Sequence, residues 1–167
     1  MWLNADDWKR VQETVPVVCV DVTPVRFGDD GRAQAIGLIL RDTPHQGRRW
    51  CLVGGRVLHN ESLADAVTRH LAQTLGDAIH FHIEADAQPV YVAQYFTVAH
   101  SVGVVDPRQH SVAMNYLVGV EGPVVARGEA YDFCWFPRQQ LPRPQELGFG
   151  QDTILKECLR RAKIWTD

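Results

Sequence analysis

The spacing of apolar residues predicts β-strands over much of the chain. Val15–Val22 is a continuous β-branched run, which is typical of a strand buried on both faces. Ala35–Arg41 predicts a second strand, and the turn residues between the two runs indicate a hairpin. The remaining strand-like runs are rich in β-branched and aromatic residues; they are Trp50–Gly55, Ala78–Ala85, Pro89–Ala99, Ser111–Glu121 and Tyr131–Pro137.

Three segments have the periodicity and end signals of helices instead. Asn4–Val15 begins with a capping asparagine and has one apolar side. In Ser62–Gly76, the serine and Asp65 form a capping-box signature, and the glycine fits the left-handed position that ends a helix. Asp152–Ile164 is amphipathic. The order of helix, strands, central helix, strands and final helix predicts an α+β fold, an α/β/α sandwich with a mixed β-sheet.

Composition narrows the class of protein. The 167 residues are 46% hydrophobic and 22% charged, which suits a single globular domain over residues 1–167. A formal net charge of -3 favours neither nucleic acid nor an anionic membrane as a partner. The N-terminus lacks the features of a secretory signal, and no apolar run is long enough to cross a bilayer, so we expect a cytoplasmic protein. Cys19, Cys51 and Cys134 are predicted to be small core residues, because no cysteine pair has zinc-site spacing.

One stretch, residues 54–76, combines a double glycine, a loop, a helix and a closing glycine in the sequence GGRVLHNESLADAVTRHLAQTLG. Its spacing resembles the Nudix box, G-x5-E-x7-R-E-U-x-E-E-x-G, in which U is a bulky apolar residue. Three carboxylates of that box are replaced by His70, Gln73 and Thr74, so the box is degenerate. The residues that match it are Gly55, Glu61, Arg69, Leu71 and Gly76.

Further pieces of the chain resemble one Nudix group, the GDP-mannose mannosyl hydrolases. They are WLNADDW and VPVVCVD near the N-terminus, the spacing from Arg41 to Trp50, GGRV at 54–57 and NYLVGV at 115–120. The resemblance implies a Nudix-type α/β/α sandwich. It also implies hydrolysis of a nucleoside diphosphate sugar or a related nucleoside diphosphate derivative.

The metal site is where the chain departs from the family. In Nudix enzymes, carboxylates on one helix face and a carbonyl of the glycine loop hold Mg²⁺, which neutralises the diphosphate. At about 100° per residue, positions 70, 73 and 74 fall on that face, whereas Asp65 lies on the far side. The resemblance implies Gly54 and Glu129 as remaining metal ligands, and Ala130 stands where the family has a general-base histidine. Weakly bound Mg²⁺ or Mn²⁺ and a metal-free site both stay open.

The residues that handle the substrate in the family have counterparts here. The resemblance implies that Arg41 assists the departing diphosphate and that Arg56 contacts it after the glycine pair. It implies that Asp21 lies at the base-binding end and that Tyr116 faces the diphosphate, while Tyr95 stands in the place of a histidine. Guanidinium groups suit phosphate oxygens because their paired N–H donors match two oxygens at once.

Other charged residues have simpler predicted roles. Glu61 and Arg69 are expected to pair and to fix the loop over the helix. Arg48 and Arg49 are expected to form a solvated loop edge.

The sequence leaves open which residue would act as the general base of a hydrolase. Glu129 could act as the base itself. A histidine could supply it from the loop between His100 and His110, which could close over a ligand.

Two functions are therefore compatible with the sequence. One is a divergent hydrolase in which Arg41, Arg56 and Glu129 act on a nucleoside diphosphate derivative. The other is a catalytically inactive module that binds a nucleotide or nucleotide sugar. The family resemblance also implies a homodimer, for which Trp2 and Trp8 could serve as interface residues.

Overall fold

A mixed nine-stranded sheet organises the protein, whose computed structural model describes residues 3–165. Three α-helices accompany the sheet within those residues: α1 (Ala5–Thr14), α2 (Leu63–Leu75) and α3 (Gln151–Arg161). The strands are β1 (Val17–Phe27), β2 (Ala33–Thr43), β3 (Gly47–Cys51), β4 (Val53–Arg56), β5 (His80–Phe81), β6 (Tyr91–Phe96), β7 (Val104–Val105), β8 (Ser111–Glu121) and β9 (Asp132–Phe136). Within this same part of the chain, no helix has the length and apolar character needed to cross a membrane.

The central strand β1 connects the two halves of the sheet. The strand order is β3-β2-β1-β8-β6-β7, with β4 also pairing with β1, β5 with β8 and β9 with β2. β1 runs parallel to β8 and antiparallel to β2 and β4, so the sheet is mixed as predicted.

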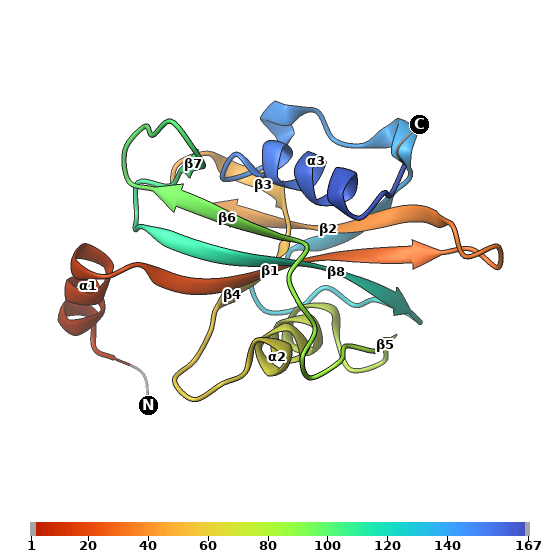
Figure 1. Ribbon diagram of the computed structural model, residues 1–167, viewed down its shortest axis with the longest axis horizontal. Helices are drawn as coiled ribbons and strands as arrows, with labels where there is room; N and C mark the ends of the chain where they lie inside the picture. Colours follow the sequence, from red (N-terminus) through yellow and green to blue (C-terminus); the bar gives the residue numbers. More distant parts are fainter. Residues whose placement is uncertain (1–2, 166–167) are drawn as a thin grey trace.

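Helices cover both faces of the sheet, which confirms the predicted α/β/α sandwich (Figure 1). On one face, Val67 and Leu71 of α2 pack with Val20 of β1 in a fully buried cluster. On the other face, the cluster contains Ile154 of α3 and Leu38 of β2. Burial of apolar side chains on both faces explains the continuous apolar run of β1.

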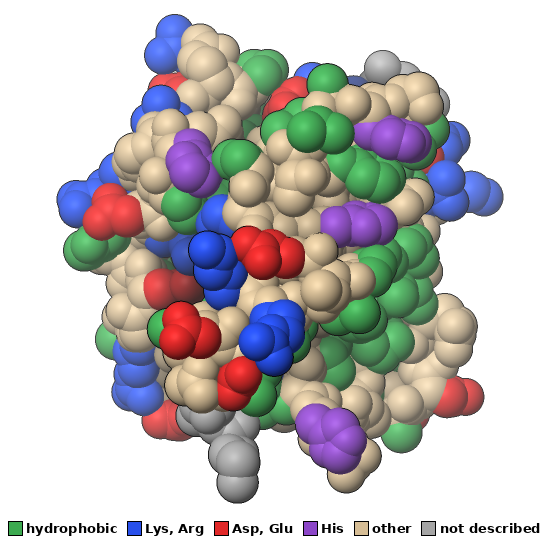
Figure 2. Space-filling view, turned by 90° about the vertical axis from the view of Figure 1, so that its left-hand side faces the viewer, with side chains coloured by type: hydrophobic (Ala, Val, Ile, Leu, Met, Phe, Trp, Pro, Cys, Tyr) green, Lys and Arg blue, Asp and Glu red, His purple; other side chains and the backbone are tan. Residues whose placement is uncertain are grey.

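The first helix, α1, lies at the edge of the sheet beside the start of β1 (Figure 1). The side chain of Asn4 caps it by accepting a hydrogen bond of 2.9 Å from the Asp7 amide. No residue of α1 is buried. Figure 2 shows acidic and basic side chains intermixed on the molecular face that carries this helix.

The segment Trp50–Gly55, predicted as one strand, is two strands that meet at Leu52. Before Leu52 the chain pairs with β2, and after it the chain pairs with β1. The Leu52 amide leaves both ladders and donates a 2.9 Å hydrogen bond to the side-chain carbonyl of Gln151. This partner lies in α3, so the break depends on tertiary structure and not on local sequence.

The predicted strand Ala78–Ala85 shortens to His80–Phe81 because only these two residues find partners at the end of β8. The other runs, from 89 to 99, from 111 to 121 and from 131 to 137, contain β6, β8 and β9 respectively.

Glu61 and Arg69 brace the loop that precedes α2, as predicted. The guanidinium of Arg69 donates to both carboxylate oxygens of Glu61, at 2.6 and 2.8 Å, and also to the Arg56 carbonyl at 3.0 Å. Glu61 in turn accepts a hydrogen bond from the Leu58 amide. α2 then begins with the predicted cap, in which the Ser62 hydroxyl accepts from the backbone N–H three residues later. Gly76 ends it with a φ of 90°.

The glycine pair allows β4 to approach its neighbours closely. A Cβ atom on Gly54 would lie 2.2 Å from the Val20 carbonyl oxygen of β1. A Cβ atom on Gly55 would lie 2.7 Å from the ring of His70. Any side chain at Gly54 would therefore force β4 away from the central strand.

We predict that Gly54→Ala lowers the free energy of unfolding by about 3 kcal/mol, because the added methyl group meets backbone that cannot move independently. Gly47→Ala is the matched control. Gly47 has a φ of 69° but open space around its Cβ position, so its cost is limited to about 1 kcal/mol of backbone strain. Urea denaturation of both variants measures the difference, and equal losses would contradict the close approach of β4 to β1.

Candidate functional site

A cavity of about 530 Å³ opens beside β4 and is large enough for a small organic ligand. Elements far apart in the chain line it, among them α1, the start of β1, β4, one side of α2 and the segment before α3. The predicted site residues on its wall are Asp21, Arg41, Gly54, Gly55, Arg56, Arg69, His70, Gln73, Thr74, Tyr95 and Glu129. Most of the site residues predicted from the sequence thus line one cavity.

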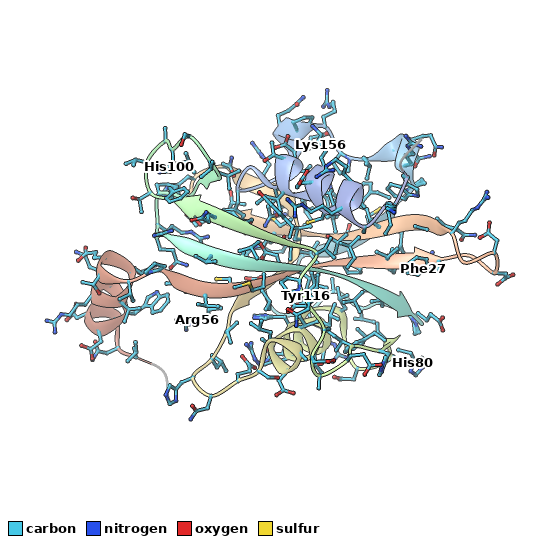
Figure 3. The ribbon with its side chains drawn as sticks, viewed as in Figure 1. Phe27, Arg56, His80, His100, Tyr116 and Lys156 are labelled. Atoms are coloured by element: carbon cyan, nitrogen blue, oxygen red, sulfur yellow. The ribbon has the colours of Figure 1, made fainter. Side chains whose placement is uncertain are left out.

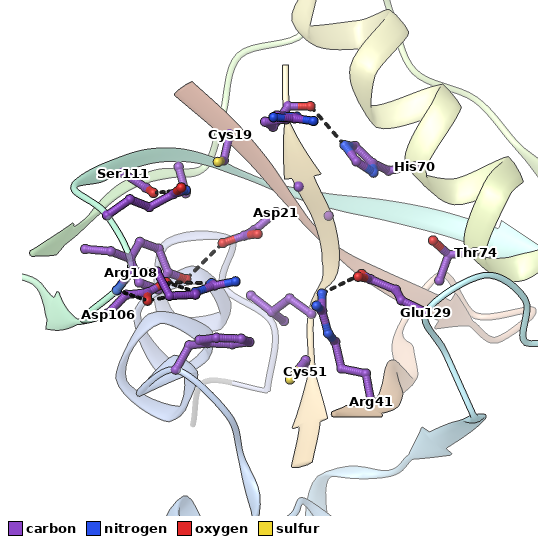
Figure 4. Close-up of a pocket in the computed structure, with 18 of the residues that line it drawn as sticks. Cys19, Asp21, Arg41, Cys51, His70, Thr74, Asp106, Arg108, Ser111 and Glu129 are labelled. Carbon is purple, nitrogen blue, oxygen red and sulfur yellow. Dashed lines mark hydrogen bonds and ion pairs between the residues drawn. The ribbon is translucent and has the colours of Figure 1, made fainter. Parts of the chain in front are cut away.

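Arg41 and Glu129 form an ion pair inside this cavity, as Figure 4 shows. Arg41 comes from β2 and Glu129 from the loop before β9, and their closest atoms are 2.5 Å apart. Burial raises the pKa of Glu129, and the positive charges of Arg41 and Arg108 partly offset that rise. The carboxylate therefore keeps a stronger affinity for a proton than an ordinary glutamate has.

Arg56 ends β4 and extends toward α1 (Figure 3). The carbon at the centre of its guanidinium lies 4.2 Å from the centre of the Trp8 ring. Cation–π contact of this kind orients the guanidinium through its flat face, whereas its N–H donors lie along its edge. Trp8, an expected dimer-interface residue, is thus part of the cavity wall. Trp2 lies outside the described residues, and the homodimer stays a prediction.

Asp21, Tyr95 and Gln151 form a buried hydrogen-bonded chain on the cavity wall. The Tyr95 hydroxyl donates to the Asp21 carboxylate at 2.9 Å, and the Gln151 amide donates to the Tyr95 oxygen at 3.4 Å. Burial raises the pKa of Asp21 to about 6, although the hydrogen bond from Tyr95 and the charge of Arg41 act in the opposite direction. Asp21 therefore changes its charge close to neutral pH.

The face of α2 that corresponds to the metal-binding face of Nudix enzymes carries His70, Gln73 and Thr74. Nε2 of His70 lies 3.2 Å from the Arg56 carbonyl oxygen, so this nitrogen carries the proton that it donates to that oxygen. Burial lowers the pKa of His70 and so favours a neutral ring. Thr74 is buried, whereas Gln73 is exposed.

The side chains on this helix face and the predicted ligands Gly54 and Glu129 do not fit a resident Mg²⁺ or Mn²⁺ ion. Within residues 3–165, no group of three His, Cys, Asp or Glu side chains is arranged to hold a metal. Glu129, the carboxylate implied as a ligand, is paired with Arg41. Hard divalent cations require several oxygen ligands, and the predicted pair of Gly54 and Glu129 supplies too few.

The structure adds one arginine of the cavity wall, Arg108, that the sequence did not indicate. Arg108 follows β7 and donates to both carboxylate oxygens of the buried Asp106, at 2.9 and 2.6 Å. Its guanidinium carbon lies 4.7 Å from the centre of the Phe149 ring. The signal that could have indicated this site is the spacing in Asp-Pro-Arg, which allows an arginine to fold back onto a carboxylate two residues earlier.

Tyr116 is not among the residues that line the cavity. Its side chain is buried in the core cluster under α2, and its hydroxyl donates to the Ala87 carbonyl at 3.3 Å (Figure 3). Alternation along β8 explains this location, because Tyr116 has the same parity as Val118 and Val120, which belong to the same cluster.

His100 and His110 also lie away from the cavity wall. Both rings stack on Phe96, with ring centres 4.2 and 4.8 Å from its own. The described structure therefore offers no role for either histidine as a base in the cavity, and Glu129 is the predicted candidate that lies there.

Comparison with known proteins agrees with this fold. A family model described as a domain of unknown function, DUF4916, matches residues 1–164. None of the curated proteins compared with the chain matches it. A solved structure from Jonesia denitrificans, described as that of possible asymmetric diadenosine tetraphosphate hydrolases, is 32% identical, with a TM-score of 0.84 over 92% of this chain and 99% of that chain.

Two further solved structures have the same fold. A MutT Nudix hydrolase from Burkholderia pseudomallei is 25% identical, with a TM-score of 0.64 over 86% of this chain and 98% of that one. The Nudix domain of NrtR from Shewanella oneidensis, solved with ADP ribose, is 20% identical, with a TM-score of 0.58 over 96% of this chain and 99% of that one. The chain therefore belongs to the DUF4916 family and, by its fold and its similarity to solved Nudix hydrolases, to the Nudix superfamily.

Proposed function

We propose that the cavity binds a nucleoside diphosphate derivative, such as a nucleoside diphosphate sugar, and hydrolyses it. The observation that carries this proposal is the convergence of Arg41, Arg56 and Glu129 on one cavity wall. The description of the Jonesia denitrificans relative, which names a dinucleoside tetraphosphate as substrate, also supports an enzyme that acts on a nucleotide derivative.

The arginines suit the diphosphate of such a ligand. A diphosphate concentrates negative charge, and guanidinium groups offer paired donors with a permanent positive charge. Arg56 is oriented by Trp8, so little side-chain entropy is lost when it binds an anion. Arg41 exchanges its partner Glu129 for phosphate oxygens, which releases the carboxylate within the same cavity.

The released carboxylate provides the chemistry in this proposal. For a nucleotide sugar, a water oxygen attacks the sugar carbon that carries the diphosphate, and the bond from that carbon to the diphosphate oxygen breaks. The electron pair stays on the diphosphate, whose charge Arg41 and Arg56 stabilise, and Glu129 accepts the proton of the water. The raised pKa of Glu129 makes it a stronger base than an exposed glutamate.

A second candidate function is binding without hydrolysis. Ala130 occupies the position of the family's base, and His70, Gln73 and Thr74 replace the carboxylates of the box. Those substitutions favour a module that senses a nucleotide derivative. Product release from a bound nucleotide sugar separates the two candidates, because only the hydrolase releases a nucleoside diphosphate.

We predict that Arg56→Ala weakens binding of the best ligand among ADP-ribose, GDP-mannose and UDP-glucose by about 10- to 100-fold, since it removes charged hydrogen bonds to phosphate. Arg48→Ala is the matched control, because Arg48 is exposed and lies outside the cavity. Isothermal titration calorimetry measures both affinities. Equal affinities of Arg56→Ala and the unchanged protein would contradict the proposed contact between Arg56 and the diphosphate.

Removal of divalent cations is predicted to leave ligand binding intact. With EDTA present, the ligand should stabilise the protein against heating at least as well as with Mg²⁺, because arginines neutralise its charge. Mg²⁺ should if anything weaken binding, since it competes with the arginines for the phosphate. Binding that becomes about 10-fold tighter in Mg²⁺ would instead indicate a metal site.

The pH dependence of stability should report the burial of Asp21. Its pKa is about 6 in the folded protein, against 3.8 for an ordinary aspartate, so the folded state holds more protons than the unfolded state between these values. Stability should therefore fall as the pH rises from about 4 to about 6. Asp21→Asn keeps the shape without the buried charge, and it should be more stable than the unchanged protein by about 2 kcal/mol above about pH 7 and by little near pH 4. A gain that is equal at both pH values in urea denaturation would contradict this origin.

A further inference from the structure

Two guanidinium groups converge in the cavity over one aromatic ring. Arg41 and Arg108 both line the cavity, and Figure 4 shows Arg41 beside Glu129 and Arg108 beside Asp106. The guanidinium carbons lie 5.8 Å and 4.7 Å from the centre of the Phe149 ring. An anion that contacts both guanidinium groups would interact favourably with two positive charges in a partly enclosed space.

Each arginine is anchored by a carboxylate on its outer side. Asp106 holds Arg108 through two parallel hydrogen bonds and is almost fully buried, which fixes the guanidinium in direction. Glu129 holds Arg41 but is more exposed, so this pair can open more easily. A guanidinium has five N–H donors, so each arginine keeps N–H groups beyond those that bind its carboxylate.

The ring beneath them is held by an unusual backbone. Phe149 has a φ of 56°, in the left-handed region, and it is the residue between two glycines. Its amide donates a 2.7 Å hydrogen bond to the side chain of Gln46. A non-glycine residue in this conformation costs about 1 kcal/mol, and such strain is concentrated at ligand sites.

We propose that Arg41 and Arg108 form a second anion subsite over Phe149, which takes a further phosphate group beyond the diphosphate bound at Arg56. The proposal rests on the proposed function, because Arg41 is shared between the two subsites. Arg108 and Arg56 line the same cavity from different elements, the segment after β7 and the end of β4. A terminal phosphate, with three oxygens, matches two guanidiniums better than a carboxylate with two. A third phosphate in the same chain should therefore add affinity beyond that of a diphosphate.

Inorganic pyrophosphate and tripolyphosphate are suitable probes, titrated calorimetrically in EDTA at one ionic strength. The unchanged protein should bind tripolyphosphate at least about 10-fold more tightly than pyrophosphate. Arg108→Ala should weaken tripolyphosphate binding much more than pyrophosphate binding and so remove this preference. Arg108→Lys, which keeps a charge without the two-pronged geometry, should lie in between.

Two further variants control for the loss of the Asp106–Arg108 ion pair and for the removal of an arginine outside the cavity. Arg108→Ala leaves the buried Asp106 without its charged partner, so the double variant Asp106→Asn/Arg108→Ala supplies the same test with both charges removed. Arg26→Ala is the matched control, because Arg26 also stacks on an aromatic ring, Trp135, at 4.4 Å but does not line the cavity. It should bind both probes like the unchanged protein.

The outcomes separate this subsite from the diphosphate site. Equal affinities of the unchanged protein for the two probes, or an equal loss of both in the Arg108 variants, would overturn the second subsite. Pyrophosphate binding that still depends on Arg56 would then leave the proposed function standing. Failure of the unchanged protein to bind either probe would overturn both.

Discussion

The close pairing of β4 with β1 is the constraint on which the site depends. Gly54 lies so near the Val20 carbonyl that only a hydrogen atom fits between them. The register sets Gly54 opposite Asp21, so the central strand and the glycine segment share one cavity wall. The chain reaches β4 only by leaving β2 at Leu52, where the freed amide is satisfied from α3. One backbone crossing thus brings the arginine after the glycines and the arginine of β2 to the wall of one cavity.

Inside that cavity, two arginines are each paired with a carboxylate. Arg41 is matched by Glu129 and Arg108 by Asp106. Asp21 is the exception, because burial raises its pKa instead of a cation neutralising its charge. Guanidinium groups stay charged at any physiological pH, so the cavity offers preorganised positive charge without a bound ion. An anionic ligand gains most where a guanidinium can exchange its internal partner for phosphate.

Local patterns predicted the parts of the fold that depend on local rules. The cap at Ser62 and the bridge between Glu61 and Arg69 follow from spacing within one loop and helix, and both are present. The break at Leu52 was missed because its hydrogen-bond partner lies 99 residues away. The location of Tyr116 away from the cavity wall follows from its parity along β8, which turns its side chain toward α2. Arg108 was missed because its position depends on how a loop folds back over the sheet, which periodicity does not encode.

The most direct test of the account is a crystal structure of the protein with GDP in the absence of divalent cations. The account predicts that the diphosphate lies between the guanidiniums of Arg41 and Arg56, and that Glu129 has separated from Arg41. A diphosphate bound elsewhere, or a cavity in which the Arg41–Glu129 pair persists beside bound GDP, would contradict the central claim that arginines of this cavity hold the ligand's phosphates.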